Sequence, residues 1–123
     1  MQIRLPLAII EDQKPIREML HQYLCAQPEF ECVLTAVSME DFFRQLPALG
    51  TLPVLVLSDI GLPGRSGIEG LPLILARLPE AQVLMLSVYT DAACVFEAIC
   101  AGAAGYIVKG DNVGVYTATQ GNY

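Results

Sequence analysis

Five polar residues lie at or just after the ends of short apolar segments in this 123-residue chain. Glu11 and Asp12 follow one segment, Asp59 follows another, Ser87 ends a third and Lys109 follows a fourth. Carboxylates a few Å apart repel one another unless a cation lies between them, and oxygen-rich acidic sites suit Mg²⁺. With that ion bound, one carboxylate can attack a phosphoryl group while Lys109 and the Ser87 hydroxyl offset charge on its oxygens. Asp59 is the best candidate nucleophile, because Glu11 and Asp12 are adjacent and better placed as metal ligands.

Each of these residues has an ordinary structural explanation when it is taken alone. An acidic pair after a strand commonly caps a helix, and an aspartate before Ile-Gly-Leu-Pro can begin a turn. Ser87 can bond to backbone, and Lys109 can be a surface cation. Turn chemistry does not explain why all five meet at one edge of a sheet, so we favour the site.

The positioning elements are predicted from an alternation of strand-length apolar runs with segments long enough for helices. Runs such as Val-Leu-Val-Leu are apolar on both faces, as in parallel strands covered by helices on each side. We therefore expect a doubly wound α/β domain, in which the carboxyl ends of the strands form the ligand crevice. The predicted strands are 5–10, 32–37, 53–58, 82–88 and 105–108.

Helix signals lie between these runs. Apolar residues at helical spacing predict a first amphipathic helix, and its apolar face consists of Ile16, Met19, Leu20, Tyr23 and Leu24. Pro15 suits a first helical position, Thr90 can cap the fourth helix, and two capping boxes are predicted, Ser38 with Asp41 and Ser66 with Glu69. Pro72 would remove a hydrogen bond from a helix that begins at Ser66, so we expect a kink or a late start there.

Composition excludes several classes of protein. The chain is 54% hydrophobic and only 16% charged, which is incompatible with a disordered tail. Its net charge of −6 disfavours binding to nucleic acid or an anionic membrane, since phosphate contacts need clustered Lys and Arg. No run is long enough to span a membrane, and the first residues lack signal-peptide features, so the cytoplasm is the expected location.

The cysteines and the single histidine are predicted to have no role in chemistry. Without C-x-x-C pairing and in mostly apolar surroundings, the cysteines are expected to be reduced core residues, and not bridges or ligands. His21 is predicted to be a surface side chain. The cysteines are Cys25, Cys32, Cys94 and Cys100.

Four phrases give the chain a specific family resemblance over about residues 2–110. It resembles the receiver domains of two-component response regulators. It is similar to the chemotaxis receiver, and its motifs are most similar to those of the NarL/LuxR type. The phrases are IIEDQ at 9–13, LSDIGLPG at 57–64, LMLSVY at 84–89 and AGAAGYIVKG at 101–110. The resemblance implies a flavodoxin-like, five-stranded parallel sheet in the order 2-1-3-4-5 with helices on both faces.

The resemblance also implies roles for the acidic residues. Asp59 would be the phosphoacceptor and a Mg²⁺ ligand, and Asp12 a direct Mg²⁺ ligand. Glu11 would act on the ion through a water, and the Gly61 backbone carbonyl would be a third protein ligand.

Other roles implied by the resemblance concern the phosphoryl group and the switch. Lys109 and Ser87 would hold the phosphoryl oxygens. The Ser87 hydroxyl would move toward the group while the aromatic ring of Tyr106 turns inward. Tyr89 either tunes access to the phosphoryl group or lines the loop.

The end of the chain departs from the family. Residues 1–110 are predicted to form the receiver domain, and 111–123 an atypical tail of truncated, frameshifted or engineered origin. Two glycines, β-branched residues and no helical periodicity predict that the family's fifth helix is missing or degenerate. Surface left bare would favour a homodimer through the fourth helix and fifth strand, or a tail that covers the gap in extended form.

The predicted function is signalling. A sensor histidine kinase would phosphorylate Asp59, the change would switch a protein-interaction surface, and the domain would then dephosphorylate itself without being an enzyme in any other sense. A DNA-binding domain can follow a receiver in the full gene. The alternatives are a phosphorylation-silent dimerisation module and a phosphatase of the haloacid dehalogenase type, although the latter expects an aspartate at the position of Gly61.

Overall fold

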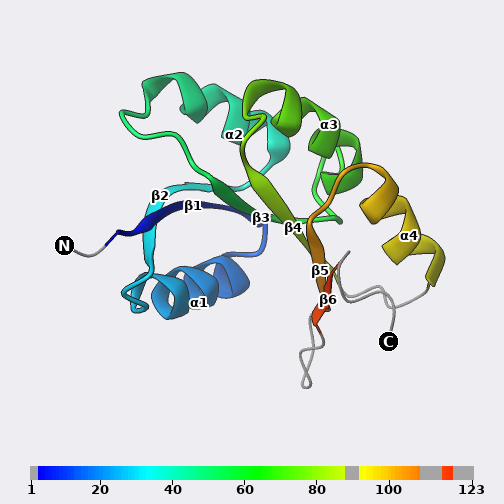
Figure 1. Ribbon diagram of the computed structural model, residues 1–123, viewed down its shortest axis with the longest axis horizontal. Helices are drawn as coiled ribbons and strands as arrows, with labels where there is room; N and C mark the ends of the chain where they lie inside the picture. Colours follow the sequence, from blue (N-terminus) through cyan, green and yellow to red (C-terminus); the bar gives the residue numbers. More distant parts are fainter. Residues whose placement is uncertain (1–2, 88–91, 109–114, 118–123) are drawn as a thin grey trace.

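A six-stranded sheet organises the molecule (Figure 1), and the computed structural model describes residues 3–87, 92–108 and 115–117. The strand order is β2-β1-β3-β4-β5-β6. The first five strands pair in parallel, which confirms the predicted 2-1-3-4-5 order, and β6 pairs antiparallel with β5. The strands are β1 (Leu5–Ile10), β2 (Phe30–Ala36), β3 (Leu55–Asp59), β4 (Gln82–Ser87), β5 (Gly105–Val108) and β6 (Val115–Thr117).

Helices cover both faces of this sheet. Figure 1 shows α1 on one face and α2, α3 and α4 on the other. This arrangement is the doubly wound one that the apolar strands predict. The helices are α1 (Lys14–Cys25), α2 (Met39–Gln45), a 3₁₀ turn (Leu46–Ala48), α3 (Gly67–Arg77) and α4 (Ala92–Cys100).

The main core lies between the sheet and the three helices on the second face. Alternate residues of β1, such as Ala8 and Ile10, belong to it, and Leu7 and Ile9 between them are equally buried toward the first face. Burial on both sides leaves these strands little freedom to shift, because a one-residue slip would exchange their faces. The ends of β1 and β3 are therefore firmly placed.

The start of α3 shows how the sequence fixes a helix boundary. Ser66 Oγ accepts a hydrogen bond from Glu69 N at 3.1 Å, and the Glu69 carboxylate accepts one from Ser66 N at 3.0 Å. This capping box was predicted and is confirmed. The helix begins at Gly67 and includes Pro72, so of the two predicted outcomes the late start is wrong, and the kink stays a prediction.

The other predicted capping box is only half formed. Ser38 Oγ accepts from Asp41 N at 3.0 Å, as expected. The Asp41 carboxylate, however, accepts a hydrogen bond from Val37 N and also contacts Arg44. It therefore does not accept the hydrogen bond from Ser38 N that would complete the box. The predicted cap at Thr90 lies outside the described residues.

The predicted apolar face of α1 is only partly correct. Ile16, Leu20 and Leu24 are half-buried against the sheet, but the side chains of Met19 and Tyr23 are 58% and 68% exposed. Among the described residues, α1 is the only helix on its face of the sheet, so part of its apolar surface has no helix beside it. No helix in the described part of the chain has the length and apolarity needed to cross a bilayer.

The tail contains a strand that was not predicted as such. Three residues, 115–117, form β6 beside β5, so the sheet has one strand more than the five expected. The strand agrees with a tail in extended form. The rest of the predicted tail lies outside the described residues.

The prediction for the cysteines is wrong for three of the four. Cys25, the last residue of α1, and Cys32 of β2 form a disulfide, with their Cα atoms 5.9 Å apart. The end of α1 packs over the beginning of β2, and that contact brings together two cysteines that their spacing does not pair. Cys94 is half-buried and lies outside the disulfide, whereas the free Cys100 is exposed instead of lying in the core.

Candidate functional site

The three predicted carboxylates meet at the carboxyl ends of β1 and β3. These strands are neighbours, and Ile10 pairs with Ser58, so the residues that follow Ile10 lie beside Asp59. One carboxylate oxygen from each of Glu11, Asp12 and Asp59 lies within 4.8 Å of the others. We call these three residues the acidic cluster.

Backbone and side-chain hydrogen bonds hold the turn after β1. Glu11 N donates to Ala36 O at 2.9 Å, and a Glu11 carboxylate oxygen accepts from Gln13 N at 3.0 Å. Arg17, in the first turns of α1, donates to the backbone carbonyls of Glu11 at 3.0 Å and Asp12 at 3.3 Å. Arg17 thus orients the acidic turn while placing a positive charge beside it.

Arg17 was not singled out in the sequence. The signal that could have found it is a cation five or six residues after an acidic pair, in the first turns of the following helix. Such a side chain can reach back over the turn to its carbonyls.

The start of α3 packs against the backbone of Asp59 and Ile60. Ile60 N donates to Leu86 O at 3.0 Å, and Gly67 N donates to Ile60 O at 2.9 Å. A Cβ at Gly67 would overlap the backbone carbonyl oxygen of Asp59 and would lie 2.9 Å from Ile60 Cα. Glycine is required here by close approach, and its absence of a side chain lets α3 pack directly on the strand end.

The carboxylate of Asp59 is oriented by the next turn. Gly61 N donates to Asp59 Oδ1 at 3.3 Å. Asp59 is 6% exposed and Glu11 fully buried, whereas Asp12 is exposed, so the cluster opens to solvent on one side. An ion or a phosphoryl donor can therefore approach from the side of Asp12.

The other predicted site residues lie on the next two strands. Ser87 ends β4 and is almost fully buried, one residue beyond Leu86, which pairs with Asp59. Tyr106 of β5 is fully buried in the core, and its hydroxyl donates to Cys94 Sγ of α4 at 3.4 Å. Lys109 and Tyr89 lie outside the described residues.

The donor set of the acidic cluster fits a hard divalent cation. All three side chains offer carboxylate oxygens, which Mg²⁺ prefers, and Mg²⁺ keeps several waters, which suits a site open on one side. A cation between the carboxylates would also relieve their mutual repulsion.

Comparison with known proteins shows the family to which this fold belongs. Residues 7–115 match the model of the response regulator receiver domain. The chain belongs to this family. Receiver domains are the phosphorylation-controlled inputs of two-component response regulators, and they generally bind Mg²⁺.

The relatives of this receiver domain are mostly transcriptional regulators. It is 37% identical over 103 residues to the transcriptional regulatory protein LnrK of Bacillus subtilis, covering 84% of this chain and 46% of that one. It is 35% identical over 101 residues to the DNA-binding transcriptional activator DevR/DosR of Mycobacterium tuberculosis, covering 82% and 46%. The receiver domain thus spans about half the length of these relatives.

A solved structure supports the same assignment. A two-component response regulator of the LuxR family from Aurantimonas aligns with a TM-score of 0.79 and 26% identity, covering 89% of this chain and 76% of that one. The predicted family, fold and NarL/LuxR type are confirmed, and neither the phosphatase nor the silent-module alternative finds support.

Proposed function

We propose that this receiver domain accepts a phosphoryl group on Asp59 in a Mg²⁺-dependent reaction. The observation that carries the proposal is the meeting of Glu11, Asp12 and Asp59 within 4.8 Å at the strand ends of a receiver fold. Asp59 is the acceptor because it ends the central strand β3 and its carboxylate is oriented by Gly61 N.

The residues divide the chemistry between them. The Asp59 carboxylate attacks the phosphorus of a phosphohistidine, so that an O–P bond forms as the N–P bond breaks and the histidine keeps the electron pair. Mg²⁺, when bound, offsets charge on the transferring oxygens. Asp12, Asp59 and the Gly61 carbonyl would hold the ion directly, and Glu11 would act on it through a water.

The switch begins from the added charge. A phosphoryl group brings about −1.5 to −2 charges and three strong acceptor oxygens. Lys109 and the Ser87 hydroxyl hold these oxygens, and Ser87 stands one residue beyond the strand pair that contains Asp59. Tyr106 follows Ser87 as the second member of the switch, and its hydrogen bond to Cys94 connects it to α4.

The partners follow from this role. A sensor histidine kinase is the phosphoryl donor, and α4 with β5 forms a homodimer surface, on which Phe96 is 70% exposed. Residues 1–110 form the receiver and 111–123 an atypical tail, of which residues 115–117 pair with β5 as β6. We place the protein in the cytoplasm, with a DNA-binding domain following the receiver in the full gene and no direct binding of nucleic acid or membrane by this segment.

We further propose that the domain is a switch and not an enzyme with an external substrate. Water hydrolyses the aspartyl phosphate, and the domain thereby returns to its resting state by self-catalysed dephosphorylation. Receiver domains of regulators are in general not catalytic.

The test is phosphorylation by acetyl phosphate with Mg²⁺, read as a mass increase of one phosphoryl group that hydroxylamine removes. Asp59→Asn is expected to abolish it. Glu80→Gln, an exposed carboxylate outside the cluster, is the matched control and is expected to react normally. Undiminished incorporation in Asp59→Asn would contradict the proposal, and a folded wild type that binds Mg²⁺ without reacting would support the silent module.

A further inference from the structure

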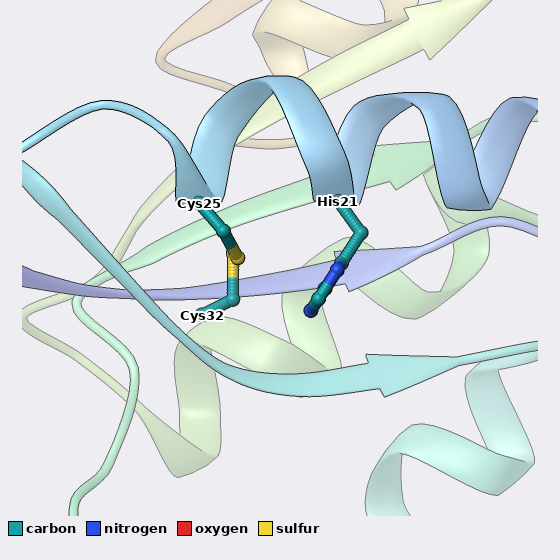
Figure 2. Close-up of side chains that lie close together, drawn as sticks. All are labelled: His21, Cys25 and Cys32. Carbon is teal, nitrogen blue, oxygen red and sulfur yellow. A yellow bond between two sulfur atoms is a disulfide. The ribbon is translucent and has the colours of Figure 1, made fainter.

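A second group of metal-ligating side chains lies between α1 and β2. One ligand atom from each of His21, Cys25 and Cys32 lies within 4.8 Å of the other two. Figure 2 shows the imidazole of His21 and the side chain of Cys25 leaving the same side of α1, toward the strand that carries Cys32. We call these residues the thiol–imidazole cluster.

The geometry points to a binding site for a thiophilic metal ion, Zn²⁺. The site forms when the Cys25–Cys32 disulfide is reduced. The disulfide and the metal site are then two alternative states of one cluster. This proposal is independent of the phosphorylation of Asp59.

The spacing in α1 suits metal binding. His21 and Cys25 are four residues apart, so their side chains lie one above the other on one helix face. Thiolate and imidazole are the ligand types that Zn²⁺ prefers. Cys32 approaches from the neighbouring strand, and such a ligand fixes the ion between two elements of the fold.

The distances are compatible with both states. Ligand atoms around one tetrahedral Zn²⁺ lie about 3.5–3.8 Å apart, given metal–ligand bonds of about 2.0–2.3 Å. The Cα atoms of Cys25 and Cys32 are 5.9 Å apart, and both sulfurs can reach a common ion by rotation of their side chains. The His21 ligand atom is already within 4.8 Å of both sulfurs.

The site is accessible to a reductant and to an ion. His21 is exposed, and both bridged cysteines are partly exposed. A surface hollow of about 340 Å³ lies beside His21, lined by Arg17, Glu18, Gln22 and Thr35 as well. The imidazole of His21 can therefore be reached from solvent.

A dithiol reductant converts the disulfide to the metal-binding form by supplying two electrons. A thiolate of the reductant attacks one cysteine sulfur, the S–S bond breaks, and the other cysteine leaves as a thiolate. The second thiol of the reductant then attacks the mixed disulfide, the bond to the cysteine sulfur breaks and releases the second cysteine thiolate, and the reductant leaves as a cyclic disulfide. Zn²⁺ then displaces the remaining thiol protons and binds two thiolates and the unprotonated imidazole nitrogen.

The experiment uses Co²⁺ as a spectroscopic probe on the reduced, full chain under anaerobic conditions. A thiolate-to-Co²⁺ charge-transfer band and tetrahedral visible bands are expected at one ion per chain. The acidic cluster cannot give the first band because it has no sulfur. Oxidation of the same wild-type chain to the disulfide is expected to abolish the band, a comparison that needs no variant.

Variants then assign the ligands, with Zn²⁺ affinity measured by chelator competition. Cys32→Ser and Cys25→Ser are each expected to weaken binding by more than about 100-fold, since loss of a partner that merely supports a ligand costs about 10–100-fold. His21→Ala is expected to weaken it by at least about 10-fold and to shift the visible bands. The matched control, Cys100→Ser, removes an exposed free cysteine elsewhere and is expected to change nothing.

Three results would overturn the proposal: no charge-transfer band in the reduced wild type, a band that persists in Cys32→Ser, or unchanged Zn²⁺ affinity in His21→Ala. Circular dichroism of each variant shows whether it is folded. Phosphorylation of Asp59, measured in the same samples, separates failure of this proposal from failure of the proposed receiver function.

Discussion

The acidic cluster and the thiol–imidazole cluster each bring three potential ligands within 4.8 Å, but the fold holds them in different ways. The acidic residues lie at the ends of the two neighbouring central strands β1 and β3, and α3 packs against the end of β3. The thiol–imidazole cluster joins a helix end to the edge strand β2, and a covalent bond holds two of its members. The packing of the core fixes the positions of residues on central strands, whereas the positions of residues at the sheet edge depend on local bonds such as the disulfide.

The same helix connects both clusters. Arg17, near the beginning of α1, binds the carbonyls of the acidic turn, and Cys25 at its end forms the disulfide. If core packing holds one cluster and local bonds the other, it should be possible to disrupt each one alone.

The largest effect is expected from removing a direct metal ligand. Asp12→Asn should weaken Mg²⁺ binding by more than about 100-fold, because even loss of a partner that supports a ligand costs about 10–100-fold. Glu11→Gln, acting through a water, should cause a smaller loss. Calorimetric titration measures both, and reduction of the disulfide should leave wild-type Mg²⁺ affinity unchanged. A greater loss in Glu11→Gln than in Asp12→Asn would reverse the two assigned roles.

Gly67→Ala should disrupt the acidic cluster through the backbone. Its Cβ would meet the Asp59 carbonyl oxygen and Ile60 Cα, which cannot rotate away as a side chain would. We expect a loss of about 3 kcal/mol or more in the free energy of unfolding, at the upper end of overpacking effects. Urea denaturation measures it.

Gly50→Ala is the matched control for that variant, since nothing lies within 4 Å of a Cβ there. It should change stability by less than about 0.5 kcal/mol. A Gly67→Ala protein as stable as Gly50→Ala would show that α3 moves freely away from Asp59.

Reduction of the disulfide should affect stability and leave the acidic cluster intact. The bridged cysteines are 7 residues apart, and closing such a short loop is worth about 2.5 kcal/mol on the chain-entropy model. Urea denaturation with and without a phosphine reductant, in the presence of a chelator, measures the difference. Cys100→Ser with the bridge intact is the control, and coincident unfolding curves in the two redox states would show that packing alone holds α1 to β2.

The smallest effect is expected at acid pH. The backbone and side chain of Ser66 lower the pKa of the Glu69 carboxyl by hydrogen bonding to its charged form. The stabilisation is therefore fully present above the pKa of glutamate in the unfolded chain. It is lost as pH falls through the lower pKa of the folded state.

Glu69→Gln keeps an acceptor for the capping box but removes this titration. Its free energy of unfolding should fall less steeply than that of the wild type between about pH 5 and pH 3. Parallel pH profiles would mean that Glu69 does not contribute through its charge.

The acidic cluster could be predicted because each of its residues is placed by the end of a strand that is visible in the sequence. Each apolar run ends visibly, and the residue after it must lie at the carboxyl edge of a parallel sheet. The strand ends at Ile10 and Val108 agree with the predicted ones, and β2 begins two residues early, where Phe30 pairs with Leu5.

The thiol–imidazole cluster could not be predicted in this way. Cys25 and Cys32 meet only because α1 packs over the beginning of β2, and neither the spacing of seven nor local propensity encodes that crossing. The exposure of Met19 has a similar origin, since it depends on which helices share a face of the sheet. Periodicity indicates which side of a helix is apolar, but not whether a neighbour covers it.

The short strand β6 has a consequence for how the molecules behave toward one another. Without it, β5 would offer a row of unpaired amides and carbonyls, and a strand of another molecule could extend the sheet there. The antiparallel pairing of Gly105, Tyr106 and Ile107 with residues 115–117 occupies that row. Removal of residues 115–117 should therefore expose a template for intermolecular strand pairing, and the tail would protect solubility whatever its origin.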